Sequence, residues 1–224
     1  MVSGTVALCL EANPELTWRD VQGVLIDSAV KTDPTDSDWY SNAAGKHVNH
    51  KYGFGRINAT AAVETALTWQ NMGDEILIES GIRTVEENIP EESSISFTWI
   101  CSQNIIVEHV DIFFDASHTH RGQLRITITS PKGTESVLAE KRNDRNPNYA
   151  YWKFMTIRNW GEGSFGPWTI TVSDETHDNT IGMLNFFEIN IYGHEHIGGN
   201  TFGDDNSQSY DVGLPSIPWD HSDD

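Results

Sequence analysis

The chain has 224 residues, with 14 Lys and Arg against 33 Asp and Glu, which gives a formal net charge of −19. So acidic a chain lacks the clustered cations of a general nucleic-acid-binding surface, and we expect no nucleic-acid partner. No apolar run approaches the roughly 20 residues of a membrane span, and the two cysteines, Cys9 and Cys101, exclude a scaffold built on several disulfides.

Charge and composition divide the chain into three stretches. Residues 1–73 hold 5 basic and 8 acidic residues, a net −3, and residues 74–194 hold 9 and 18, a net −9. Residues 195–224 hold seven acids and no Lys or Arg, and they are rich in Gly, Asp, Ser and Pro. This last stretch predicts a disordered acidic tail, because it offers little apolar surface to bury.

Residues 1–73 show helical spacing with helix-start signals. Thr17 followed by Asp20 is typical of a capping box, and Asn58 predicts the N-cap of a further helix. Pro and Gly residues within 33–55 predict a long loop between these helices. The segment has no evident strand partners and is too thin for a core of its own. We therefore expect it to cover part of a larger domain.

Residues 74–194 change to a two-residue period, which is typical of half-buried strands. A turn signal, Ser130-Pro131-Lys132-Gly133, separates two of the runs. Several short strands with turns between them predict an antiparallel β-sandwich of jelly-roll type. The alternating runs are 94–99, 110–115, 124–129, 168–173 and 187–191.

Three segments of the helical part carry a family resemblance. Residues 1–8, Met-Val-Ser-Gly-Thr-Val-Ala-Leu, resemble the helix that follows the catalytic serine in subtilisin-like proteases. Residues 10–22 and 47–59, the latter containing His-Lys-Tyr-Gly-Phe-Gly-Arg-Ile-Asn, continue the likeness. Together they resemble the kexin and furin branch, the proprotein-convertase-like proteases.

The strand-rich part resembles the P domain, or Homo B domain, of the same family. The matching elements are 118–124, 130–134, 154–156, 159–162, 166–170 and Asp174. Gln123 stands where the family pattern has Asp, which weakens any acidic role at that position. The resemblance implies an α plus all-β chain. It would hold a short helical remnant of an α/β subtilisin-like catalytic domain (1–73), a P domain (74–194) and the tail.

The resemblance implies a serine endopeptidase whose P domain stabilises the catalytic domain. The family's Asp, His and Ser triad and its oxyanion-hole Asn all precede the position that matches Met1. We therefore expect the chain alone to be inactive. Ser3 lies within the helix without a local base, so we do not expect it to act as the nucleophile. The expected partners are an upstream catalytic domain and, for the parent enzyme, a peptide or protein substrate. A secreted or secretory location is implied for the parent only.

A second hypothesis treats the sandwich as a stand-alone binding or regulatory module for a protease, a peptide or a glycan. The aromatic candidates for such a face are Trp152, Trp160 and Trp168, although the P-domain likeness favours packing roles for the last two. The pairs His118 with His120 and His194 with His196 lack a third ligand at fixed spacing, which favours structural roles over metal binding.

Calcium is the metal that the sequence favours, because its acidic loops offer oxygen ligands. The candidate ligands would converge if the loops meet at one end of the sandwich. Solvated turn carboxylates that cap backbone N–H groups are the alternative. The candidates are Asp111, Asp115, Asp174, Glu175 and Asp178.

Overall fold

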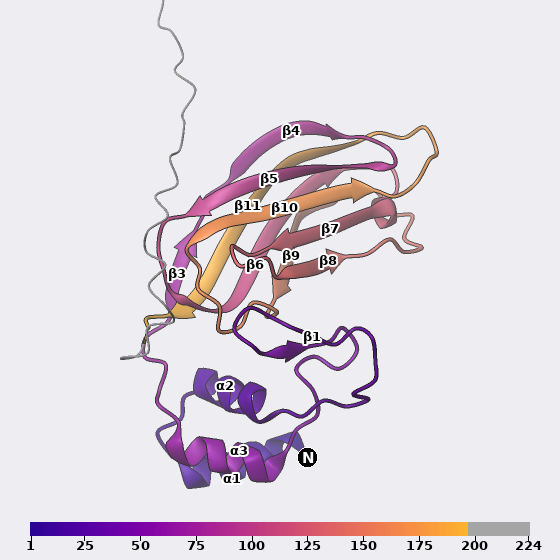
Figure 1. The fold of residues 1–224 in the computed structure, drawn as a ribbon. Coiled ribbons are helices and arrows are strands. Elements are labelled where there is room, and N and C mark those ends of the chain that lie inside the picture. Colours follow the sequence, from indigo (N-terminus) through magenta and orange to yellow (C-terminus); the bar gives the residue numbers. More distant parts are fainter. Residues whose placement is uncertain (197–224) are drawn as a thin grey trace, which may run out of the picture.

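The computed structural model describes residues 1–196 and contains three helices below a two-layered sandwich (Figure 1). Within these residues, no helix is long and apolar enough to cross a membrane. The elements are α1 (Val2–Ala12), α2 (Trp18–Ser28), β1 (Tyr40–Ser41), β2 (His47–Val48), α3 (Ala59–Thr68), β3 (Ile76–Glu79), β4 (Arg83–Ile89), β5 (Ser93–Cys101), β6 (Ile106–Ser117), η1 (Arg121–Gln123), β7 (Leu124–Thr129), β8 (Glu135–Ala139), β9 (Tyr149–Thr156), β10 (Gly166–Asp174) and β11 (Gly182–His194). The predicted acidic tail lies almost wholly outside the described residues.

Both predicted helix caps are confirmed. The Thr17 hydroxyl accepts the N–H of Asp20, and the Asp20 carboxylate accepts the N–H of Thr17 at 2.8 Å, which completes a capping box. The Asn58 side chain accepts the N–H of Ala61 and caps α3. The loop between these helices is not structureless, because β1 and β2 pair within it as a short antiparallel hairpin.

Asp20 also fixes the connection from the helices to the sandwich. Its fully buried carboxylate accepts hydrogen bonds from the indole N–H of Trp69, the amide of Asn71 and the N–H of Met72, at 2.9, 3.1 and 2.9 Å. Burial by itself would raise the pKa of Asp20, but the hydrogen bonds from Thr17, Met72 and Trp69 outweigh burial and lower the pKa. The connecting segment is thereby held against the start of α2.

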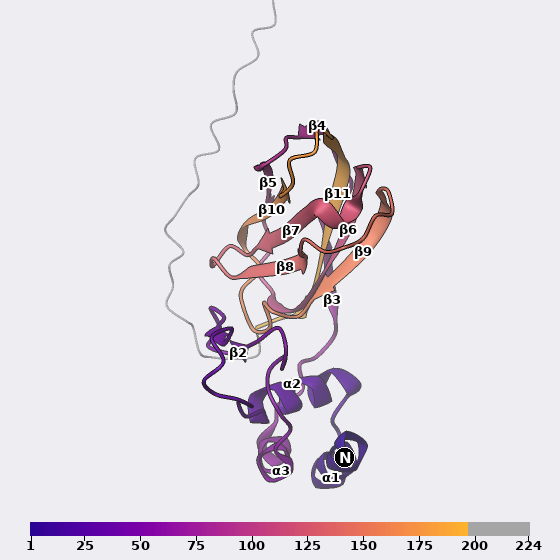
Figure 2. The same cartoon turned by 90° about the vertical axis from the view of Figure 1, so that its right-hand side faces the viewer.

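Two antiparallel sheets form the sandwich, as the alternating runs predict. One sheet has the order β5-β10-β7-β8 and the other β3-β11-β6-β9, with β4 also paired to β11. Figure 2 shows the two sheets as separate layers. Their inner faces enclose a single core whose largest fully buried side chains include Trp168, Tyr149 and Phe114. The 168–173 run lies in β10 with Trp168 fully buried, which confirms its packing role.

The helical segment buries only a small cluster of its own. Cys9, Leu16 and Val24 meet Ala62 and Ala66 where α1 and α2 pack on α3. Cys9 and Cys101 are both free and buried, and burial raises the pKa of each thiol. The small size of this cluster agrees with the expectation that the helices cover a larger body.

Substitution of two helical glycines by alanine should change the stability of the chain in opposite directions. An added Cβ at Gly23 would lie 2.4 Å from the Met72 side chain and 2.5 Å from the Trp69 ring, whereas one at Gly4 would meet nothing within 4 Å. We expect Gly4→Ala to raise the free energy of unfolding by about 0.5–1 kcal/mol through helix propensity. Gly23→Ala should lower it by about 1–3 kcal/mol through overpacking. Urea denaturation followed by circular dichroism measures both, and equal stability of the two variants would contradict this packing of α2.

Candidate functional site: the interface between helices and sandwich

A buried ion pair joins α2 to β6. Arg19 on α2 is 6% exposed and Glu108 on β6 is 2% exposed. The guanidinium makes a two-pronged contact, with Nε donating to Glu108 Oε2 at 2.8 Å and a second nitrogen donating to Oε1. Arg19 also donates to the carbonyl oxygen of Gly73 at 2.7 Å, in the segment that leads into the sandwich. One arginine therefore holds the helices, the connection and the sandwich together.

Glu108 is satisfied from two directions. The His194 ring nitrogen Nδ1, at the end of β11, lies 2.8 Å from Glu108 Oε1 and shares that oxygen with Arg19. Burial acts to raise the pKa of Glu108, but the hydrogen bonds from Arg19 and His194 and the charge of Arg19 lower it to about 2. The carboxylate is thus held ionised inside the interface.

A second contact region fixes the β1–β2 hairpin to the sandwich. The buried amide of Asn42 donates to the carbonyl oxygens of Arg158 and Trp160, each at 2.9 Å. The N–H of Ala43 donates to Glu162 Oε1 at 2.9 Å. Each contact joins a side chain of one partner to a backbone group of the other, so the hairpin and the 158–162 turn hold each other in one conformation.

Glu162 is the hub of this second region. Its carboxylate is 2% exposed and accepts hydrogen bonds from the hydroxyls of Ser130 (2.7 Å) and Thr134 and from the amide of Asn159 (3.3 Å). Two of the segments matched by resemblance, 130–134 and 159–162, therefore meet at one buried carboxylate. Their residues position the hairpin rather than a reacting group.

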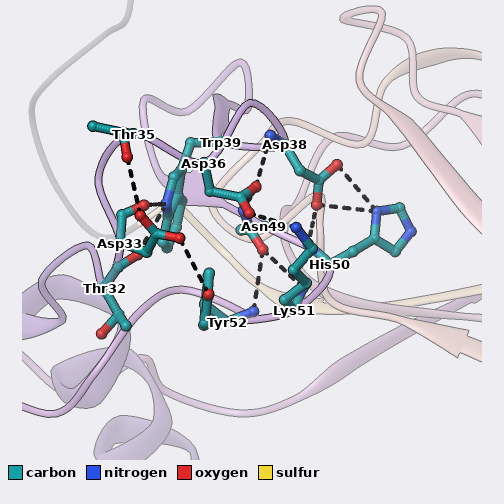
Figure 3. A network of polar contacts seen from close by, with 10 residues as sticks. All are labelled: Thr32, Asp33, Thr35, Asp36, Asp38, Trp39, Asn49, His50, Lys51 and Tyr52. Atoms are coloured by element: carbon teal, nitrogen blue, oxygen red, sulfur yellow. Dashed lines mark hydrogen bonds and ion pairs between the residues drawn. The ribbon is translucent and has the colours of Figure 1, made fainter.

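A polar network orders the loop that carries this hairpin (Figure 3). The Asp36 carboxylate accepts the N–H of Asp38 at 2.9 Å, the Asn49 amide at 3.0 Å and the Lys51 ammonium. The ammonium of Lys51, followed by the hydrogen bonds from Asp38 and Asn49, lowers the pKa of Asp36 to about 2. His50 contacts Asp38 through its backbone N–H and its ring. These acids serve as acceptors that close the loop.

An apolar cluster seals the interface between the two contact regions. Val48, Phe54 and Met72 of the helical segment pack with Trp160 of the sandwich. All four side chains are at most 8% exposed. The buried position of Trp160 confirms the packing role predicted for it, whereas Trp152 is 40% exposed. Apolar burial is expected to supply most of the free energy of association here, and the polar contacts fix the geometry.

The structure separates the five predicted calcium ligands. Asp111 lies in β6 with Lys153 Nζ 2.5 Å from its Oδ2, and Asp115 accepts from the Tyr151 N–H and the Asn185 amide. Asp111 and Asp115 belong to the sheet β3-β11-β6-β9, and Asp174 to the sheet β5-β10-β7-β8.

The other three candidates surround the His118 loop. Asp174 Oδ2 accepts from His118 Nε2 at 3.0 Å inside the sandwich. His118 Nδ1 lies 3.1 Å from the backbone N of His120 and 3.0 Å from its carbonyl oxygen, so the ring is held by contacts at both nitrogens. Gln123 donates to Asp178 at 2.6 Å, a bond that the Asp of the family pattern could not donate.

Glu175, the remaining calcium candidate, makes its contacts through its backbone. Its N–H donates to the Gln123 carbonyl oxygen, and its own carbonyl accepts from Lys141. Within residues 1–196, no group of three or more His, Cys, Asp or Glu side chains could hold a metal ion. The arrangement therefore does not fit a calcium centre built from these five residues, and calcium binding by the chain stays a prediction.

Several apolar side chains of the helices are exposed. On α1, Val2, Leu8 and Leu10 are 54%, 49% and 39% exposed, and Leu67 on α3 is 63% exposed. Because Leu8 and Leu10 point to nearly opposite sides of α1, apolar exposure extends around much of this helix, as expected of a helix that a larger body covers. Ser3 lies exposed on the same helix, and none of the described side chains makes a hydrogen bond to its hydroxyl.

Comparison with known proteins assigns the two parts separately. The subtilase family model matches residues 1–55, and the proprotein convertase P-domain model matches residues 107–191. The chain thus combines the end of a subtilase-type catalytic domain with a P domain. It belongs to the kexin- and furin-like proprotein convertase family.

Similar relatives come from animals and yeast. The chain is 36% identical to a PC3-like endoprotease, variant B, of Hydra vulgaris over 83% of its own length and 28% of the relative's. It is 34% identical to human proprotein convertase subtilisin/kexin type 6, over 93% and 23%. It is also 34% identical to Protease KEX1 of Kluyveromyces lactis, over 86% and 27%. The chain thus spans about a quarter of the length of these relatives.

The fold is shared with a bacterial enzyme. The crystal structure of the serine protease of Aeromonas sobria aligns with a TM-score of 0.74 and 22% sequence identity, covering 86% of this chain and 43% of that protein. The likeness extends over the helices as well as the sandwich, because the sandwich alone would not reach this coverage.

Loss of the buried ion pair should be costly. Glu108→Gln removes the close counter-ion of the buried Arg19 and leaves it only the more exposed Glu75, 3.9 Å away. We expect the free energy of unfolding to fall by about 3–5 kcal/mol. Asp27→Asn is the matched control, because Asp27 pairs with Lys46 near the surface, with about 30% of each side chain exposed. That control should cost less than about 1 kcal/mol. Urea denaturation measures both changes, and equal losses of stability in the two variants would mean that the buried pair does not hold the interface.

The same carboxylate predicts a dependence of stability on pH. The pKa of Glu108 lies at about 2 in the folded chain against its ordinary 4.5. Its contribution is therefore complete above pH 4.5 and is lost as the pH falls through about 2. Urea denaturation across this window should show a smaller loss of stability in Glu108→Gln than in the unaltered chain. Identical pH profiles would contradict the assignment.

Proposed function

We propose that the chain is part of a serine endopeptidase that hydrolyses peptide bonds, and that its sandwich holds the last helices of the catalytic domain in place. The observation that carries this proposal is the buried Arg19–Glu108 pair, which joins a subtilase segment to a P domain across their interface. The named convertase and protease relatives support the activity of the parent enzyme.

In this proposal the sandwich acts as a brace for the catalytic domain. α2 and the β1–β2 hairpin each have one buried carboxylate of the sandwich as a partner, Glu108 for the first and Glu162 for the second. Two separated fixing points, with an apolar cluster between them, prevent both sliding and rotation of the helices on the sandwich. A catalytic site built above these helices would inherit that rigidity.

The open face of α1 and α3 takes the remainder of the catalytic domain. The exposed Val2, Leu8 and Leu10 are distributed around α1, which is the pattern of a helix that its own domain buries on most sides. The occupant is thus an upstream segment of the same enzyme. The proposed nucleophile would lie before α1, where the helix dipole and free N–H groups favour developing negative charge.

The stand-alone module is the weaker hypothesis. It would leave residues 1–73 as a relic, yet the segment matches the subtilase family over residues 1–55 and makes buried, specific contacts to the sandwich. An isolated module has no reason to keep an exposed apolar helix face next to so well-packed an interface.

An active-site probe tests the proposed function. The natural protein, captured from its source with an antibody against the sandwich, should react with a fluorophosphonate. The labelled band should contain peptides from residues 1–196, with the label on a serine outside them. A Ser3→Ala variant of the natural gene is the control and should label fully. Absence of label on the captured protein, or label on Ser3, would overturn the proposal.

A further inference from the structure

Two β-bulges lie opposite each other across β6, and both meet at Asp115. On one side, β9 places Ala150 and Tyr151 opposite Asp115 alone. On the other side, β11 inserts Asn185 beside the same residue. Bulges bend a strand and re-aim its side chains, and they are frequent next to functional sites. Two of them facing one residue on an internal strand indicate a surface shaped for contact.

The Asp115 carboxylate holds both bulges in place. Its Oδ2 accepts the N–H of Tyr151 at 2.8 Å, and its Oδ1 accepts the Asn185 amide at 2.7 Å. The same amide donates to the Ser117 hydroxyl at 3.1 Å. Because one side chain ties the two strands on either side of it, the bulges form a single preorganised unit.

The unit presents an exposed aromatic ring at an energetic cost. Tyr151 has a φ of +44°, in the left-handed region that bulky residues avoid, and it is 54% exposed. Its ring stacks on Phe113, with centroids 5.1 Å apart and planes at 26°, and borders Phe186 at 5.8 Å. Neither the unfavourable φ of Tyr151 nor the exposure of its ring stabilises the fold, which points to a functional role for this residue. We call these three rings the aromatic platform.

The surroundings of the platform narrow the class of ligand. β6 and β11 are internal strands whose backbone groups pair with neighbours on both sides. β9 is the edge strand, but the bulge at Ala150 and Tyr151 interrupts its regular backbone, which disfavours addition of an extended peptide there. Asp115 and Glu188 lie on the same face and repel phosphate groups, which excludes nucleic acid and anionic lipid. Lys153 already covers Phe113, with its ammonium 5.7 Å from the ring centre, so Tyr151 is the open ring.

A sugar ring fits the open Tyr151 ring and the acceptor side chains beside it. It offers a C–H face that stacks on an aromatic ring and hydroxyls at its edge that bond to carboxylate and amide groups. We infer that the aromatic platform binds a neutral sugar ring, stacked on Tyr151, whose hydroxyls donate hydrogen bonds to the side-chain oxygen of Asn185 and the carboxylate of Glu188. The site lies on the outer face of the sandwich, and it stands whether or not the proposed peptidase function holds.

Saturation-transfer difference NMR and calorimetry on the full chain test the inference. The probes are maltohexaose, cellohexaose and mannohexaose, and at least one should bind in the millimolar range. Tyr151→Gly should weaken that binding at least tenfold while it keeps or raises the melting temperature, because glycine adopts positive φ without strain. Tyr151→Phe keeps the ring and should bind as the unaltered chain does.

Trp18→Ala provides the matched control, because Trp18 is an aromatic side chain exposed to 64% on α2, away from the platform. It should leave sugar binding unchanged. Failure of all three probes to bind the unaltered chain would overturn the inference, as would full binding by Tyr151→Gly. Binding of a tri-arginine peptide that depends on Tyr151, with no sugar binding, would show that the platform recognises cations instead.

Discussion

The buried carboxylate of Glu108 is the constraint on which the arrangement of this molecule depends. An ionised group with 2% exposure is stable only with partners on every side, and Arg19 and His194 are those partners. One comes from the helices and the other from the last strand of the sandwich. The two bodies must therefore assume one relative position, since any other would leave a charge buried alone.

Acidic side chains in this chain act largely as structural acceptors. By accepting hydrogen bonds, Asp20 fixes the connection to the sandwich, Glu162 fixes the β1–β2 hairpin, and Asp115 fixes two bulges. Each accepts backbone or amide N–H groups that a loop or bulge would otherwise leave unpaired. The strongly acidic composition is consistent with an irregular framework held by carboxylates, in addition to the charge that keeps such a protein soluble.

The sequence predicts the helices and strands correctly in these places, but not the contacts between them. The two-residue period placed strands such as 168–173, and Thr17, Asp20 and Asn58 placed helix starts, because these signals are local. Arg19 and Glu108 lie 89 positions apart, and neither stands out within its own element, so no local pattern joins them. The protein partners of the calcium candidates were missed for the same reason, since Lys153 and Asn185 lie far in sequence from Asp111 and Asp115.

The order of the strands sets the timing of folding during synthesis. Among residues 1–196, β11 is the last strand made, yet it lies inside its sheet and pairs with β3, β4 and β6. Arg19 leaves the ribosome 89 residues before Glu108, a delay of about 4–18 seconds at ordinary elongation rates. The helices must wait through that interval, and longer for β11, with their apolar sides uncovered. The cost of this topology is a long interval during synthesis in which apolar side chains of the nascent chain stay exposed.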